Sequence, residues 1–155
     1  MEIGNVELME FARCRKIPTF EGYLNMTKQK HIDHWLNSAE KDWEIMEYLL
    51  KGKKYVHALF FGHLYLEKLA KALWVKNRDE NIPPKIHNLL KLLKEGDIEL
   101  TQEQQMFLLK LNQYQIEGRY PEDIDKLYKF TNSKIATEYL NEIKKLKKCF
   151  LKMMQ

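Results

Sequence analysis

The chain has 155 residues and a mass of 18.7 kDa, which is the size of a single domain. Hydrophobic residues at 45% exclude a wholly disordered chain, while six Gly and four Pro are too few for a turn-rich β-sandwich or barrel. The net charge of +4 permits a nucleotide or nucleic-acid partner without requiring one.

The first 25 residues differ in pattern from the rest of the chain. A Pro-Thr-Phe-Glu-Gly break at residues 18–22 separates them from a strong helical pattern that opens at Met26 and Thr27. We expect residues 1–25 to form either an N-terminal arm or an appended helix. Residues 26–155 are expected to form one helical domain.

Two long helices are expected in the first half of that domain. Apolar residues recur every three or four positions from Lys30 onward, and Gly52 is a typical stop for the helix that carries them. The segment 54–77 is apolar on nearly every side, which is typical of a helix covered by its neighbours. We therefore expect this segment to be the most buried element.

The second half is expected to hold a short helix after a proline break, a longer capped helix, a brief helical turn and a last long helix. No alternating strand pattern occurs. We therefore predict an all-α fold, an antiparallel up-and-down bundle of four main helices with short extra helices. The second-half elements are placed at residues 86–94, 101–117, 121 onward and 133–153, with breaks at Pro83–Pro84, Gly96 and Gly118.

Polar residues also occur where apolar residues are expected. Asp42 lies on the apolar stripe of the first helix, where a carboxylate needs a partner or a shifted pKa. His63, Glu67 and Lys71 follow one another at i, i+4 and i+8 on the central helix, with Lys68 beside them. Because that helix has little surface for water, these residues form either a structural seam or an interface or binding site.

Arg119 lies at a tight corner between two helices. Pro121 starts the second helix and holds the preceding Tyr120 in an extended conformation. A guanidinium in such a corner can be aimed at a carboxylate or a phosphate. We predict that Arg119 contacts Asp42 or Glu67 directly, while lysines of the central helix are the other cations within reach of Asp42.

Few other chemical motifs are present. His31 and His34 have i, i+3 spacing but no third ligand nearby, and the chain lacks a Gly-rich phosphate loop, so we expect neither a metal nor another cofactor. Residues 126–155 carry eight Lys against Glu138 and Glu142. This basic segment is either a solvated face or a nucleic-acid contact.

The location of the protein is also inferred from what the sequence lacks. Cys14 and Cys149 lie at opposite ends of the chain without a CxxC motif, which favours reduced thiols. No stretch approaches the roughly 18 consecutive apolar residues of a membrane span. The start lacks the basic and apolar regions of a signal peptide. We expect a soluble, cytoplasmic protein that does not contact a membrane.

Residues 27–150 resemble the HEPN family (higher eukaryotes and prokaryotes nucleotide-binding). Short helical motifs carry this resemblance, and their order and spacing give it specificity. The last motif looks like the Arg-Tyr-Pro signature of one branch. The motifs are Ala39–Asp42, Tyr55–Phe61, His63–Leu73, His87–Leu89 and Gly118–Pro121.

The resemblance implies a helical bundle that commonly dimerises and is often encoded beside a small nucleotidyltransferase in bacteria and archaea. Many members are metal-independent ribonucleases, and their site uses an Arg followed after four to six residues by a His. Here the corresponding window after Arg119 contains Ile124, Asp125 and Lys126, and no Arg–His pair has that spacing. An Asp does not replace an imidazole in this role, because its ordinary pKa is about 4 and not about 6.5.

We therefore interpret the chain as a non-nuclease HEPN-like module that binds a nucleotide or acts as the partner of a nucleotidyltransferase in a prokaryotic, toxin–antitoxin-like setting. A surplus of apolar surface, with three Trp and eight Tyr, predicts a homodimer. A toxin-like ribonuclease with an altered site and a purely structural interaction protein remain the alternatives. In the favoured reading, cations hold phosphate, the tyrosine stacks and Asp42 orients Arg119. The candidate site residues are Asp42, His63, Glu67, Lys68, Lys71, Arg119 and Tyr120.

Overall fold

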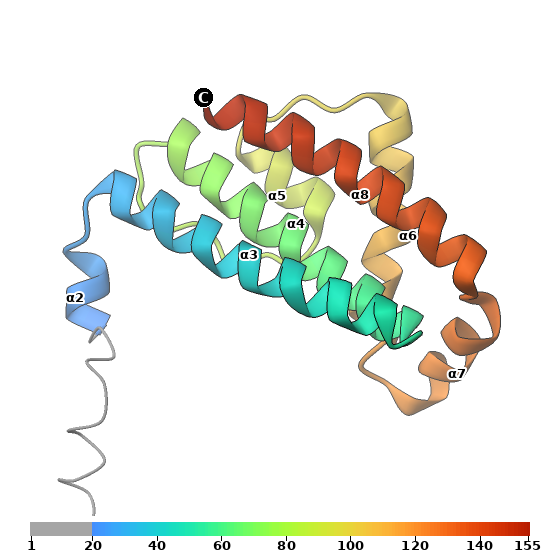
Figure 1. The fold of residues 1–155 in the computed structure, drawn as a ribbon. Helices are drawn as coiled ribbons and strands as arrows, with labels where there is room; N and C mark the ends of the chain where they lie inside the picture. Colours follow the sequence, from blue (N-terminus) through green and yellow to red (C-terminus); the bar gives the residue numbers. More distant parts are fainter. Residues whose placement is uncertain (1–19) are drawn as a thin grey trace, which may run out of the picture.

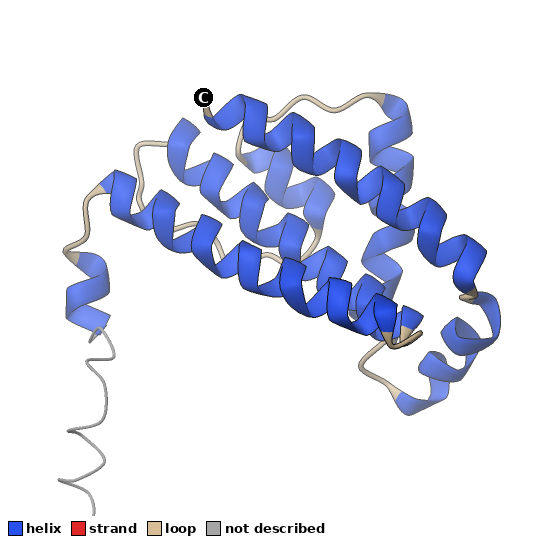
Figure 2. Cartoon of the chain, in the orientation of Figure 1, coloured by secondary structure: helices blue, strands red, loops and turns tan. Residues whose placement is uncertain are grey.

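The computed structural model describes residues 20–155, and every regular element in that range is a helix (Figures 1 and 2). The predicted all-α helical bundle is confirmed. The elements are α2 (Phe20–Leu24), α3 (Lys28–Lys51), α4 (Tyr55–Asn77), α5 (Leu89–Glu95), α6 (Gln102–Glu117), α7 (Pro121–Phe130) and α8 (Ser133–Met154).

The helices begin where the sequence supplies capping side chains. The hydroxyl of Thr27 accepts a hydrogen bond from the backbone N–H of Lys30 and starts α3. Thr101 and Gln104 form a reciprocal capping box at the start of α6. These local signals explain why most of the predicted helix ends agree with the observed ones to within about two residues. The start of α5 differs more, because it was predicted at residue 86 and lies at Leu89, after the Asn88 cap.

α4 forms the centre of the bundle, with α3, α5, α6 and α8 packed against it. Well over half of its 23 residues are buried, so the expected central position of this helix is confirmed. α3 and α4 lie side by side as a helical hairpin, and α8 covers α4 on another side (Figure 1). Gly62 lets these three helices approach closely, because a Cβ there would lie 2.7 Å from Ile143 Cδ1 and 3.1 Å from Met46 Sδ.

Hydrogen bonds join the C-terminal end of α4 to the C-terminal end of α5. The Asn77 side-chain amide donates to the Gly96 carbonyl at 2.8 Å, and Arg78 Nε donates to the Glu95 carbonyl at 2.7 Å. Asn88 then caps α5 by accepting from the backbone N–H of Lys91. This arrangement brings the residues just before α5 back onto the middle of α4.

The expectation for residues 1–25 falls largely outside the described residues, because residues 1–19 are not described. Residues Phe20–Leu24 form the short helix α2, which precedes α3. Tyr23 of α2 contacts His31 of α3 edge to face, with ring centroids 4.6 Å apart. At least this part of the first 25 residues therefore packs on the domain.

Candidate functional site

The polar residues of α4 lie inside the fold. His63 is fully buried, and Glu67 and Lys71 are 4% and 8% exposed. Because all three are inside, they are not a water-facing ladder. We call Asp42, His63, Glu67, Lys68 and Lys71 the polar seam.

Glu67 is the shared acceptor of the polar seam. Its Oε1 accepts a hydrogen bond from Lys71 Nζ at 2.7 Å and lies 3.2 Å from His87 Nδ1. Lys71 Nζ also lies 4.9 Å from the centre of the Trp35 ring, which gives it a cation–π contact. The buried carboxylate is therefore paired with a buried ammonium, which offsets the desolvation of both.

His63 is held as a neutral imidazole. Its Nε2 lies 3.0 Å from Asn112 Oδ1, and the backbone N–H of Leu89 donates to that same oxygen. The shared acceptor assigns the proton of His63 to Nε2, and leaves Nδ1 without a hydrogen bond, 3.9 Å from Glu67 Oε2. Burial lowers the pKa of His63 to about 4, although the nearby Glu67 charge opposes this shift.

Asp42 pairs with the central helix. Its Oδ2 lies 2.6 Å from Lys68 Nζ, and the two side chains are 8% and 23% exposed. The contact is an ion pair and not an aligned hydrogen bond. Lys68 Nζ also donates to the Ser38 carbonyl at 3.4 Å. The sequence-based expectation that Asp42 requires a cation is confirmed, and the cation is Lys68.

The predicted contact of Arg119 with Asp42 or Glu67 is wrong. Both carboxylates are paired with lysines or histidine, and Arg119 is exposed and forms no salt bridge with any residue in the described range. The corner that carries Arg119 meets α4 at a different point from the two carboxylates. Its Gly118 packs near Phe60, since a Cβ at Gly118 would lie 3.8 Å from that ring. Phe60 is about 12 Å along the helix axis from Lys68.

The corner at residues 118–121 instead lies at the end of the bundle where α4 begins. The backbone N–H of Gly118 bonds to the Tyr114 carbonyl and ends α6, and the proline that opens α7 follows two residues after Arg119. Tyr120 is 57% exposed beside Arg119. Tyr128 of α7 reaches back to α4, where its hydroxyl lies 3.4 Å from His57 Nδ1. The seven candidate residues therefore divide into a buried seam and an exposed corner.

Two members of the buried polar network were not among the predicted site residues. His87, whose side chain is 53% exposed, is the point at which the seam reaches solvent. Asn112 is a buried amide on α6 that binds both His63 and the start of α5. A polar residue between Leu111 and Tyr114 on the core face of a helix was the available signal for Asn112. His87 was singled out only as part of the His87–Leu89 motif of the family resemblance, and nothing in the local pattern pointed to Glu67 as its partner.

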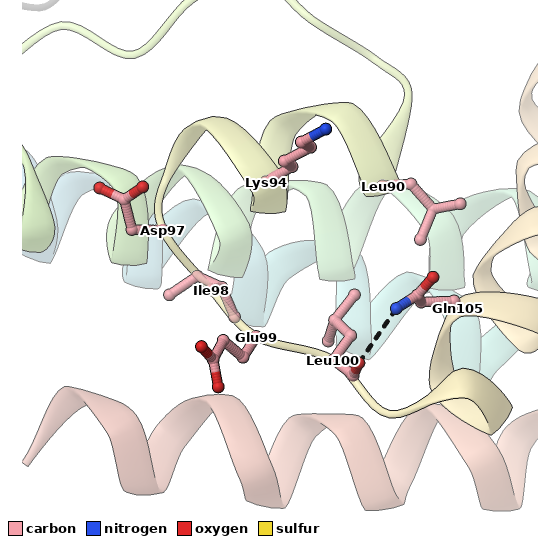
Figure 3. Close-up of a pocket in the computed structure, with 7 residues that line it drawn as sticks. All are labelled: Leu90, Lys94, Asp97, Ile98, Glu99, Leu100 and Gln105. Atoms are coloured by element: carbon pink, nitrogen blue, oxygen red, sulfur yellow. Dashed lines mark hydrogen bonds between the residues drawn. The ribbon is translucent and has the colours of Figure 1, made fainter.

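A surface hollow between α5, α6 and their connection does not contain the candidate residues. It has a volume of about 550 Å³ and is lined by Leu90, Ile98, Leu100 and Gln105 together with three charged side chains (Figure 3). Gln105 is engaged, because its amide donates to the Leu100 carbonyl at 3.0 Å. The charged ends point in different directions in Figure 3, so they do not converge on one ligand. These charged residues are Lys94, Asp97 and Glu99.

Neither a metal-ligand cluster nor a membrane span occurs within residues 20–155. No group of three or more His, Cys, Asp or Glu side chains there has a geometry that could hold a metal ion. His31 is buried, and its ring contacts the ring of Tyr23 edge to face. The helices of this part of the chain are not long and apolar enough to cross a bilayer.

The chain was compared with known proteins. The model of the HEPN domain family matches residues 32–153, which includes α4 through α7, almost all of α3 and nearly the whole of α8. The polar seam and the corner both lie inside the matched range. No curated protein and no solved structure matches the chain.

Proposed function

The chain belongs to the HEPN domain family, and we propose that it is a helical module that binds a nucleotide phosphate without cleaving RNA. Family membership supports a nucleotide- or RNA-related role for the bundle. The observation that carries the proposal is Arg119, an exposed guanidinium without a salt bridge to any described residue, beside the exposed ring of Tyr120. Guanidinium groups bind phosphate through paired hydrogen bonds.

The lysines of the polar seam are poorly suited to this role. Lys68 is paired with Asp42 and Lys71 with Glu67, so a phosphate at either cation would have to displace a carboxylate. The displaced carboxylate would then remain nearly buried without its partner, which costs about 3–5 kcal/mol. We therefore assign the polar seam to stability and the corner to binding.

Aromatic side chains at the same end of the bundle supply surfaces for bases. Tyr120, Tyr128 and Phe130 are 57%, 49% and 55% exposed. Stacking of a base on an aromatic side chain contributes about 1–3 kcal/mol and tolerates any base. Proteins that bind single-stranded nucleic acids commonly combine positive charge with aromatic rings on which bases stack.

The absence of the family's Arg–His spacing supports binding without cleavage. In the window after Arg119 the chain has Ile124, Asp125 and Lys126. The alternative of a ribonuclease with an altered site is favoured by one observation, the exposed His57, which contacts Tyr128 of α7 at this end of the bundle. His57 would then supply the imidazole from α4.

A second candidate function is that this chain acts as the protein partner of a small nucleotidyltransferase. It is favoured by Tyr128 and Phe130, because half-exposed aromatic rings and an exposed arginine are typical of protein–protein interfaces. In that case Arg119 would bind a carboxylate of the partner and not a phosphate.

A gel assay with end-labelled single-stranded RNA tests the proposal, with retention read on a native gel and cleavage on a denaturing gel. The wild-type protein should retain the RNA intact, and Arg119→Ala should weaken retention about tenfold or more, the loss expected for a charge-assisted contact. Lys148→Ala on α8 is the matched control, because Lys148 is exposed and has no salt bridge to a described residue.

The other outcomes of this assay are equally decisive. Cleavage that is lost in both Arg119→Ala and His57→Ala would establish the ribonuclease alternative. Loss of retention in Lys148→Ala alone would place the nucleic-acid contact on the lysine face of α8. An absence of retention in all proteins would remove binding of single-stranded RNA and favour the protein-partner role.

A further inference from the structure

Two helices of the bundle end in the same unusual way. Gly52 ends α3 with φ −77°, and the residue that follows it, Lys53, has φ 57°. Gly96 ends α5 with φ −86°, and the following Asp97 has φ 56°. Among the described residues, Lys53 and Asp97 are the two that combine a positive φ with a side chain. At both helix ends the left-handed conformation therefore falls on a charged residue, although a glycine stands one position earlier.

The hydrogen bonds of the turn after α3 require this conformation. The backbone N–H of Lys53 donates to the Leu50 carbonyl at 3.0 Å. The backbone N–H of Lys54 donates to the Leu49 carbonyl at 2.8 Å. The pattern is the Schellman motif, whose left-handed position is usually a glycine because a Cβ is unfavourable there. The side chain of Lys53 is therefore present at a loss of stability, which a glycine would avoid.

The turn after α5 provides an internal comparison. Asp tolerates the left-handed conformation better than most residues, and Asp97 Oδ2 lies 3.2 Å from Arg78 Nη1. Lys53 is a long side chain without that tolerance, is exposed, and forms no salt bridge with a described residue. The fold therefore accounts for the side chain of Asp97 and leaves that of Lys53 without a role.

The dipole of α3 explains a neighbouring lysine but not Lys53. Lys51 lies in the last turn of α3, where a cation interacts favourably with the free carbonyl groups of the helix end. This interaction weakens beyond the last turn, and Lys53 lies two residues past the end of the helix. Because Lys51 already supplies the charge, the dipole gives no reason for a cation at the left-handed position.

The α3–α4 turn lies at the end of the bundle that carries the corner (Figure 1). The corner meets α4 at Phe60, since a Cβ at Gly118 would lie 3.8 Å from that ring. Phe60 follows Lys54 by six residues, which is about 9 Å along the helix axis. Lys53 and Arg119 are therefore two exposed cations without salt bridges at one end of the molecule, too far apart for a single phosphate group.

We propose that Lys53 holds a second phosphate of the ligand, so that the ligand is a single strand that runs from the corner to the α3–α4 turn. The inference rests on the proposed function, because the first phosphate is the one assigned to Arg119. A mononucleotide fills the corner alone, whereas a strand of several nucleotides also reaches the turn. The half-exposed ring of Tyr128, whose hydroxyl lies 3.4 Å from Nδ1 of His57 in the first turn of α4, offers a stacking surface between the two cations.

Fluorescence anisotropy with a labelled single-stranded RNA of about 12 nucleotides, from about 50 to about 200 mM salt, tests this contact. Lys53→Gly should weaken binding about fivefold at low salt. It should also reduce the slope of log K against log salt by about 0.7, the value for one phosphate contact on a single strand. The melting temperature should rise by about 2–4 °C, because glycine adopts the left-handed conformation freely. A loss of affinity in a more stable protein cannot come from unfolding.

Two further variants serve as controls. Asp97→Gly removes the other left-handed side chain, next to Arg78 and about 35 Å along α4 from the turn, far beyond the screening length of about 8 Å. It should leave the affinity within about twofold of the wild type and the salt slope unchanged. Lys53→Arg keeps both the charge and the backbone conformation, so it should bind RNA like the wild type and gain no stability.

The outcomes separate this inference from the proposed function. If Arg119→Ala loses RNA while Lys53→Gly keeps the wild-type affinity and salt slope, the ligand is confined to the corner and only this inference is overturned. An absence of binding by the wild type at every salt concentration would overturn the proposed function and the second contact together. Equal losses in Lys53→Gly and Asp97→Gly would assign the effect to the backbone and contradict the contact. A melting temperature of Lys53→Gly below that of the wild type would remove the strain on which the inference stands.

Discussion

Asp42 on α3 and Lys68 on α4 form an ion pair, with Oδ2 and Nζ 2.6 Å apart, across the most extensive helix contact in the fold. The carboxylate is nearly buried, whereas the lysine retains contact with water at 23% exposure. Lys68 is therefore the partner of Asp42, the one carboxylate on the apolar stripe of α3 that needed a cation. It also removes Lys68 from the set of cations available to a phosphate.

Asp42→Asn should lower the free energy of unfolding by about 1–3 kcal/mol. This is less than the loss for a fully buried pair, because Lys68 can still be hydrated when its partner is lost. Urea denaturation at pH 7 measures the change. Glu40→Gln is the matched control on the same helix, since Glu40 is 52% exposed and 3.6 Å from Lys147. Equal losses in the two variants would argue against a structural role for Asp42.

Glu67→Gln should be more destabilising, by about 3–5 kcal/mol, because it leaves Lys71 charged and nearly buried without a carboxylate. Glu67→Gln combined with Lys71→Met should recover a substantial part of this loss, since neither charge then remains. Glu142→Gln, which breaks only an exposed pair, should cost less than about 1 kcal/mol. If the double variant is no more stable than Glu67→Gln, the ion pair is not the origin of the loss.

Stability should also fall as the pH is lowered through the titration range of His63. The pKa of His63 is about 4 in the folded chain and about 6.5 when unfolded, so between these values the unfolded chain binds a proton that the folded chain excludes. The free energy of unfolding should therefore decrease from pH 6.5 to pH 4, by about 3 kcal/mol for the full shift.

The pH dependence can be assigned to His63 by comparing His63→Gln with the wild type in urea titrations at several pH values. The glutamine amide can still donate to Asn112, but it does not titrate in this range. The slope of stability against pH should therefore be smaller in the variant over this window. His57→Gln is the control at an exposed histidine. A slope that is unchanged in His63→Gln contradicts the assignment.

Gly62→Ala should destabilise the bundle although alanine favours helix. The added Cβ would lie 2.7 Å from Ile143 Cδ1 and 3.1 Å from Met46 Sδ, and both side chains are fully buried. Overpacking of this kind costs about 1–3 kcal/mol, more than the gain in helix propensity of about 1 kcal/mol. Gly52→Ala, where the nearest atoms are 3.6 Å away, should be close to neutral. Thermal melts of the two variants compare these effects.

The sequence was sufficient for the features that depend on neighbouring residues. Thr27, Gly52 and Thr101 are local signals, and they placed the helix ends without tertiary information. The periodicity of α4 also indicated that Glu67 and Lys71 do not face water, because little of the helix circumference remained for it. It left open whether they form a structural seam or a binding site.

The partners across the fold could not be obtained in this way. The choice of Lys68 over Arg119 for Asp42 depends on which point of α4 each element meets. His87 reaches Glu67 only because the chain folds back after the prolines of the α4–α5 connection. Such contacts between distant segments leave no periodic pattern in a single sequence.

The central claim is that Arg119, and not the lysines of the polar seam, holds the phosphate. Calorimetric titration of the wild type, Arg119→Ala and Lys68→Met with ATP tests it most directly. Arg119→Ala should weaken binding at least about tenfold, while Lys68→Met should lower thermal stability and leave the affinity within about twofold of the wild type. The opposite result, with affinity lost in folded Lys68→Met and retained in Arg119→Ala, would contradict the account and return the binding site to the polar seam.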